Sequence, residues 1–177
     1  GMQDQYNAVY GGLKQYDFYD NNKVKVKNLS INKKRLVKFN QKLFLVYTNQ
    51  NRKSEKILGQ VKKRSNLKSL FEISKLTNQF KKELISGDLN VLGNLLHENW
   101  LLKKSLSKNT TNNKIDKLYD YGVKSGAIGG KILGAGGGGF LLFFVDHKNH
   151  KKFKKSFYKQ KIIDFNFYDK GSELIKI

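Results

Sequence analysis

The sequence has no cysteine and no proline, and it contains little alanine and little arginine. Without cysteine the chain forms no disulfides and no thiolate metal sites, which agrees with a reducing compartment such as the cytoplasm. The longest uninterrupted apolar run spans residues 140–145, too few for a transmembrane helix. The first ten residues lack the basic and apolar segments of a signal peptide. We therefore expect a soluble cytoplasmic protein that has no membrane partner.

The positive charge is large, because the formal net charge is +21 over 177 residues. Such a charge suggests a nucleic-acid-binding protein. The cations, however, are 32 Lys and only 3 Arg, whereas recognition of bases and phosphates favours the bidentate guanidinium of arginine. The 18 Asn and 3 Ala show the same bias toward A/T-rich codons. We interpret the charge as codon composition and expect scattered lysines and no nucleic-acid partner; nucleic-acid binding is the alternative.

The spacing of apolar residues predicts an α+β chain with a β-rich beginning, a helical middle and a mixed end. The predicted helices cover residues 3–10, 57–61, 67–84, 89–102, 115–123 and 150–160. The predicted strands form a hairpin over residues 14–29 and continue at residues 42–48, 140–145, 162–168 and 173–177. Residues 105–114 are polar and aperiodic, which indicates a loop.

A glycine-rich segment, residues 134–139, has five glycines in six positions. Glycine permits positive φ and close approach to the backbone, and the N–H groups of such a loop can form a nest for anions. A simple hairpin turn is the alternative, although it needs only one or two glycines. Gly134, Gly136 and Gly139 satisfy G-x-G-x-x-G, but a strand-like run follows, whereas the dinucleotide motif opens a helix. A Walker A loop is excluded because no G-K-[ST] ending is present.

Several segments, in the same order, resemble the GHMP kinases. Residues 129–145 (GGKILGAGGGGFLLFFV) resemble the third motif of that family. Residues 1–12 (GMQDQYNAVYGG) resemble its G-x-x-D-Q segment, and residues 45–52 (LVYTNQNR) resemble its Y-T-G-x-x-R strand end, with Asn49 in place of glycine. Residues 95–107 and 163–175 are most similar to the heptose 7-phosphate kinase branch.

This resemblance implies a fold and a division of the chain. Residues 41–177 would form the α+β C-terminal domain of a GHMP kinase, an antiparallel sheet packed with helices. Residues 1–40 would be the tail of the N-terminal domain. The family's second motif, P-x-x-x-G-L-G-S-S, which binds the ATP phosphates and supplies a serine for Mg²⁺, has no match. We therefore expect the intact enzyme to use ATP and Mg²⁺, and this chain alone to bind neither tightly.

The resemblance also assigns roles to single residues. Asp4 would act as the catalytic base on a sugar hydroxyl, whereas the sequence alone favours a capping carboxylate at the start of its helix. Gln5 would orient the substrate. Arg52 would bind a phosphate of the substrate, or else be a solvated arginine. Asn99, at the edge of an apolar helical stripe, would meet the substrate or be a half-buried amide.

The loop would supply the residues that bind the transferred phosphate or the nucleotide: Gly134, Ala135, Gly136, Gly137, Gly138 and Gly139. No resident metal site is expected, since His147 and His150 have no third ligand nearby in the sequence. The expected partners are a sugar or sugar-phosphate substrate and the N-terminal kinase half. We also expect self-association with another copy of the chain, because the strand edges and apolar faces that would contact the N-terminal kinase half would otherwise be exposed.

Taken together, these features predict part of a sugar kinase that transfers the γ-phosphate of ATP to the C1 hydroxyl of a sugar, with heptose 7-phosphate the acceptor of the nearest branch. Because the ATP-phosphate motif has no match, we expect the chain alone to be inactive. The alternative within the same fold is a small-molecule-binding module without catalysis.

Overall fold

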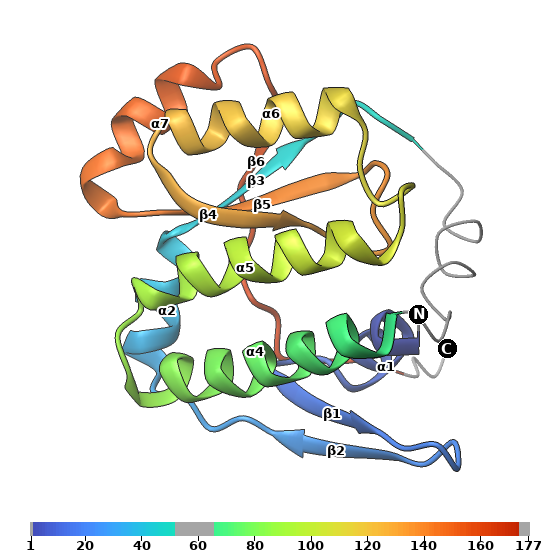
Figure 1. The fold of residues 1–177 in the computed structure, drawn as a ribbon. Helices are drawn as coiled ribbons and strands as arrows, with labels where there is room; N and C mark the ends of the chain where they lie inside the picture. Colours follow the sequence, from blue (N-terminus) through green and yellow to red (C-terminus); the bar gives the residue numbers. More distant parts are fainter. Residues whose placement is uncertain (1, 52–65, 174–177) are drawn as a thin grey trace, which may run out of the picture.

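The computed structural model describes residues 2–51 and 66–173, and its centre is an antiparallel sheet (Figure 1). The strand order in the sheet is β4-β5-β3-β6. The bounds of these strands are β3 Leu43–Tyr47, β4 Ala127–Ile132, β5 Phe140–Val145 and β6 Ile162–Ile163. All three pairings are antiparallel, as in an α+β fold rather than a parallel α/β fold.

Helices cover both faces of this sheet (Figure 1). One face carries α6 (Asn113–Lys124) and α7 (His150–Ser156), the latter preceded by the short 3₁₀ helix η2 (His147–Asn149). The other face carries α5 (Val91–Leu106), and α4 (Leu67–Ser86) packs outside α5. The fold class predicted from the sequence is therefore confirmed.

The N-terminal elements lie around α4. They are α1 (Met2–Tyr10), β1 (Lys14–Phe18), β2 (Val24–Asn28) and α2 (Lys33–Gln41). Strands β1 and β2 form the predicted hairpin as a separate antiparallel pair, and they lie on the side of α4 away from α5 (Figure 1). Lys81 of α4 donates a hydrogen bond to Gln15 of β1 over 2.9 Å. The hairpin and α1 thus come close to the helical layer that covers the main sheet.

Both faces of β5 are buried, which explains why its sequence is apolar throughout. Leu141, Phe143 and Val145 point to one face and are fully buried in the cluster with α6 and α7. Phe144 points to the other face, into the cluster with α4 and α5. Because neighbouring strand residues alternate between faces, only a strand covered on both sides needs such a run.

Helix α2 was not predicted from the sequence. Asn32 caps it, since its side-chain oxygen accepts hydrogen bonds from the backbone N–H groups of Lys34 and Arg35. Phe39 buries itself in the core, and the Arg35 side chain donates to the backbone carbonyls at the end of α4. The signal in the sequence was the asparagine cap followed by apolar residues at helical spacing. The domain boundary near residue 40 stays a prediction.

The predicted strand at residues 162–168 is wrong beyond its first two residues. Only Ile162 and Ile163 pair with β3, after which the chain leaves the sheet. Phe167 then stacks on Phe39, with ring centroids 5.8 Å apart, although 39% of Phe167 stays exposed.

Two further boundaries differ from the sequence prediction. The basic helix ends at Ser156, and the loop predicted over 105–114 is shorter, because α5 runs to Leu106 and α6 begins at Asn113. The predictions for residues 57–61 and 174–177 fall outside the described residues. Within the described part of the chain, no helix is long and apolar enough to cross a membrane.

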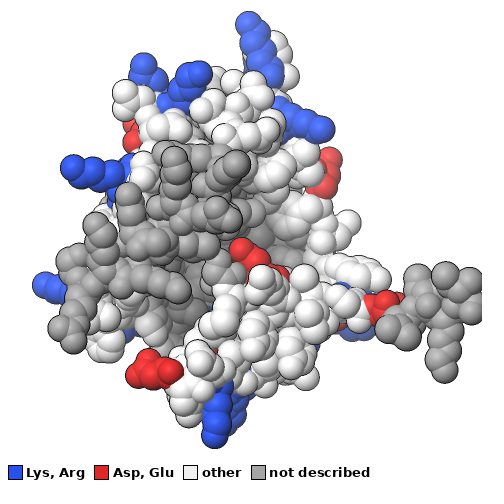
Figure 2. Space-filling view, turned by 90° about the vertical axis from the view of Figure 1, so that its right-hand side faces the viewer, with Lys and Arg blue, Asp and Glu red and all other residues white. Residues whose placement is uncertain are grey.

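Figure 2 shows the face of the molecule that carries both ends of the described chain. Among the described residues on this face, the lysine and arginine side chains stand mainly at the edges and do not gather into one patch. This part of the surface agrees with an interpretation of the charge as composition. The absence of a nucleic-acid partner stays a prediction.

Candidate functional site

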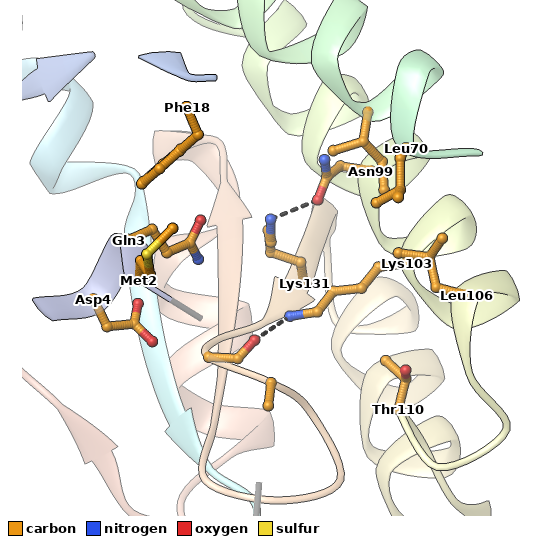
Figure 3. Close-up of a pocket in the computed structure, with 13 residues that line it drawn as sticks. Met2, Gln3, Asp4, Phe18, Leu70, Asn99, Lys103, Leu106, Thr110 and Lys131 are labelled. Atoms are coloured by element: carbon orange, nitrogen blue, oxygen red, sulfur yellow. Dashed lines mark hydrogen bonds between the residues drawn. The ribbon is translucent and has the colours of Figure 1, made fainter. Parts of the chain in front are cut away.

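A cavity of about 340 Å³ lies where α1, β1, α4, α5, β4 and the glycine-rich loop meet (Figure 3). Its lining residues are Met2, Gln3, Asp4, Phe18, Leu70, Ile73, Asn99, Lys103, Leu106, Thr110, Lys131, Gly134 and Ala135. The wall is mostly apolar, with one carboxylate, two ammonium groups and a few neutral polar groups. Cavities of this size and composition are typical of small-molecule sites.

Asp4 lies in the first turn of α1, which also places it at the positive end of the helix dipole. Its side chain is on the opposite side of the cavity from α5 (Figure 3). Among the residues described, it is the one carboxylate that lines this cavity.

Lys103 reaches into the cavity from α5. Its ammonium group donates hydrogen bonds to the backbone carbonyls of Ile132, over 3.1 Å, and of Gly134 (Figure 3). Burial, and to a smaller extent repulsion from Lys131, lower the pKa of Lys103 to about 7, whereas attraction to Asp4 opposes the shift. At neutral pH a substantial fraction of Lys103 is therefore uncharged.

Lys131 lies on β4 and points to the same cavity. It donates a hydrogen bond to the side-chain oxygen of Asn99, 2.5 Å away (Figure 3). Burial lowers the pKa of Lys131 to about 8. This contact fixes the Asn99 amide, so that its NH₂ group is the part left to meet another molecule.

The glycine-rich loop joins β4 to β5, so a strand follows the loop, as the sequence predicts, and not a helix. Gly136 has φ +101°, and a Cβ atom there would lie 2.6 Å from the Thr110 carbonyl oxygen. The N–H of Gly137, also at positive φ, donates to the same carbonyl over 2.7 Å. The loop is therefore packed tightly against residue 110, and only glycine fits at position 136.

The loop separates the main cavity from a second hollow of about 260 Å³. Gln50 and Asn51 line that hollow together with the loop. The backbone N–H groups on the loop that donate no hydrogen bond within the described parts of the chain belong to Gly134, Ala135, Gly136 and Gly138. Such unpaired amides are suited to bind anionic oxygens.

The structure brings together four of the residues singled out in the sequence. Asp4, Asn99, Gly134 and Ala135 all line the main cavity, although they are far apart in the chain. Their juxtaposition is what a substrate site requires. The roles assigned to them stay predictions.

The other predicted site residues lie elsewhere. Gly136, Gly138 and Gly139 line the second hollow, and Gly137 is buried against residue 110. Gln5 is exposed on α1 and lines neither space. Arg52 lies outside the described residues.

Lys103 and Lys131 were missed in the sequence. Lys103 is four residues after Asn99, and this spacing on a helix places both on one face. Lys131 belongs to the motif GGKILGAGGGG, but it was treated as one more lysine of a lysine-rich chain. The helical spacing was the signal that could have identified the first of the two.

Gly136→Ala is expected to destabilise the chain by about 2–4 kcal/mol, because the new methyl group would meet the Thr110 carbonyl in addition to the cost of positive φ. Urea unfolding of both proteins measures the loss. Gly139→Ala is the matched control: its φ is +83°, but no atom lies within 4 Å of the added Cβ. Equal losses in the two variants would show that packing on residue 110 does not matter.

Comparison with known proteins agrees with this architecture. Residues 80–163 match the family described as GHMP kinases C terminal. Together with the α+β fold and the strand-to-strand glycine loop, this match shows that residues 80–163 correspond to the C-terminal domain of the GHMP kinases.

Individual relatives add detail. The chain is 30% identical to the D-glycero-alpha-D-manno-heptose 7-phosphate kinase of Campylobacter jejuni over 97% of its own length and 52% of that kinase. It is 31% identical to the mevalonate kinase of Methanocaldococcus jannaschii over 72% of this chain and 39% of that enzyme. A crystal structure from Campylobacter jejuni described as a sugar kinase superposes with a TM-score of 0.72, at 31% identity, over 97% of this chain and 50% of that one. The chain thus spans about half the length of these kinases, or less.

Proposed function

We propose that the chain forms the acceptor-binding part of a sugar kinase that transfers the γ-phosphate of ATP to the C1 hydroxyl of a sugar. Heptose 7-phosphate, which the name of the Campylobacter jejuni relative contains, is the acceptor that we propose. The observation that carries this proposal is the cavity in which one carboxylate, two lysines and the unpaired N–H groups of the glycine loop converge. These are the groups that phosphoryl transfer uses for positioning and charge stabilisation.

Asp4 would accept the proton of the C1 hydroxyl as this oxygen attacks phosphorus. The free N–H groups of Gly134 and Ala135, on the same cavity, would stabilise the charge that develops on the phosphoryl oxygens. The NH₂ group of Asn99 would donate to a sugar hydroxyl, since the other end of its amide is held by Lys131. Gln5 as an orienting residue and Arg52 as a phosphate ligand remain part of the proposal without a described contact.

The proposed reaction implies ATP and Mg²⁺ in the intact enzyme, where the metal would neutralise charge on the phosphates. The described residues do not provide a metal site of their own, because no group of three His, Cys, Asp or Glu side chains clusters among them. We therefore assign no Mg²⁺ ligand and no mechanistic step through the metal to this part of the chain. ATP and Mg²⁺ would be held together with the portion of a GHMP kinase that carries the second motif.

The test is an assay of ADP release with heptose 7-phosphate and MgATP, on two proteins. The first is the 177-residue chain, from which we expect no release above background. The second, here called the joined kinase, is the portion of the Campylobacter jejuni enzyme outside the matched region, fused ahead of this chain. We expect the joined kinase to release ADP only when the sugar is present.

Three outcomes distinguish the proposed function from its alternatives. Turnover by the chain alone at about 1–100 s⁻¹, the ordinary range for kinases, would contradict the expected inactivity. A joined kinase that releases no ADP, while the Campylobacter jejuni enzyme does so in parallel, would contradict the proposed function. Sugar-phosphate binding without any transfer would instead favour a non-catalytic binding module.

A further inference from the structure

Lys103 and Lys131 form a pair of cations whose hydrogen-bonding capacity is only partly used. An ammonium group has three N–H donors. Two donors of Lys103 are taken by backbone carbonyls, and one donor of Lys131 is taken by Asn99. Within the residues that the structure describes, neither lysine forms an ion pair. Both therefore keep N–H donors for a molecule in the cavity.

When both lysines are protonated, the charges in the cavity do not balance. Its described lining holds two lysines and one carboxylate, Asp4, and all other lining groups are neutral. Two like charges in a partly buried space repel each other, which contributes to the lowered pKa of Lys103. Charged groups in such surroundings are stable when an opposite charge is close. A dianion that contacts both lysines would supply that charge.

We propose that Lys103 and Lys131 form a subsite for a phosphate monoester group that the acceptor sugar already carries. The identity of the sugar rests on the proposed function, whereas the anion subsite rests on the two lysines themselves. Phe18, Leu70 and Leu106, on the same cavity, would pack on the carbon skeleton of the sugar. A cavity of about 340 Å³ is within the usual range for such ligands.

The phosphate could instead be the one transferred from ATP. The placement of the groups favours the acceptor's own phosphate, because the reacting oxygen belongs beside Asp4, across the cavity from α5, the helix that carries Lys103 (Figure 3). Lys131 also contacts Asn99 of α5, whereas Lys103 contacts the carbonyl oxygen of Gly134 in the glycine loop. A sugar that bridges from Asp4 to the lysines would place its two ends as phosphorylation at C1 requires.

Isothermal titration calorimetry of the 177-residue chain tests this assignment without any need for turnover. The probes are heptose 7-phosphate, unphosphorylated heptose and a non-hydrolysable ATP analogue. The variants are Lys103→Met and Lys131→Met, which keep the length of the side chain. Lys152→Met, an exposed residue of α7 that does not line the cavity, is the matched control. Circular dichroism verifies that each variant is folded.

We expect the chain to bind heptose 7-phosphate at least 10-fold more tightly than heptose. Each cavity variant should lose at least 10-fold in affinity for the phosphorylated sugar and leave the affinity for heptose unchanged, while Lys152→Met changes neither. The affinity for heptose 7-phosphate should fall as the pH rises from 6.5 to 8.5. In the chain without ligand, the pKa of Lys103 is about 7 and that of Lys131 is about 8, so both lysines lose their protons over this range. Asp4 is the remaining charged group that lines the cavity in the described part of the chain.

The proposal is overturned if the chain binds no heptose 7-phosphate, or if the cavity variants bind it as tightly as the original chain. It is also overturned if they weaken the ATP analogue and leave the sugar phosphate unaffected, since the lysines would then serve the nucleotide. These results are independent of the joined kinase. Loss of sugar-phosphate binding in the variants, combined with no transfer by the joined kinase, would support the subsite and contradict only the kinase reaction.

Discussion

Asp4→Asn is expected to lower kcat of the joined kinase by about 10²–10⁴-fold, the usual contribution of a general base. The amide has nearly the same shape but accepts no proton, so the affinity for heptose 7-phosphate should change little. Steady-state kinetics at saturating MgATP separates kcat from KM. The matched control is Asp20→Asn, an exposed carboxylate in the turn between β1 and β2.

The contrary result would be equally informative. If the Asp4 variant kept more than half of the original kcat, the carboxylate would not be the base, and its place on the cavity wall would reflect only its position in the first turn of α1. A loss of the same size in Asp20→Asn would point to a general effect of charge rather than to proton transfer.

Phe143→Ala is expected to destabilise the chain by about 3–5 kcal/mol, the range for large-to-small changes in a core. Phe143 is completely buried at the centre of β5, and its ring contacts those of Tyr119, Phe153 and Phe157. The structure around it is held by the sheet and by two helices, so the cavity left by the ring should collapse only in part. Urea unfolding of the 177-residue chain gives the difference in free energy.

An exposed aromatic residue provides the control for this substitution. Tyr158 is 75% exposed, just after α7, and Tyr158→Ala should change the free energy of unfolding by no more than about 0.5 kcal/mol. A loss below about 1 kcal/mol in Phe143→Ala would mean that the cluster between β5 and the layer of α6 and α7 does not depend on this ring as described.

The elements that the sequence predicts well are those whose signal is local. The hairpin at the start and the continuous apolar run of β5 show their periods within a few residues. Asn49, in place of the glycine in the family's strand end, does adopt a left-handed conformation, with φ +52°. Asparagine adopts this left-handed conformation more readily than most other non-glycine residues.

The elements that were missed depend on distant contacts. After Ile163 the chain leaves the sheet, and Phe167 stacks on Phe39, a distant residue that no local pattern reveals as its partner. The same holds for the site. Nothing in the spacing of Asp4, Lys103 and Lys131 along the chain indicates that they share one cavity, and the abundance of lysine hid the two that are partly buried.

The central claim is that this cavity holds a sugar phosphate for phosphorylation at C1. The most direct test is ³¹P and ¹H NMR of the product formed by the joined kinase from heptose 7-phosphate and MgATP. We expect a second phosphate resonance coupled to the proton on C1, in a one-to-one ratio with the ADP formed. ATP hydrolysis to free phosphate, or a new phosphate on any other carbon, would contradict the account.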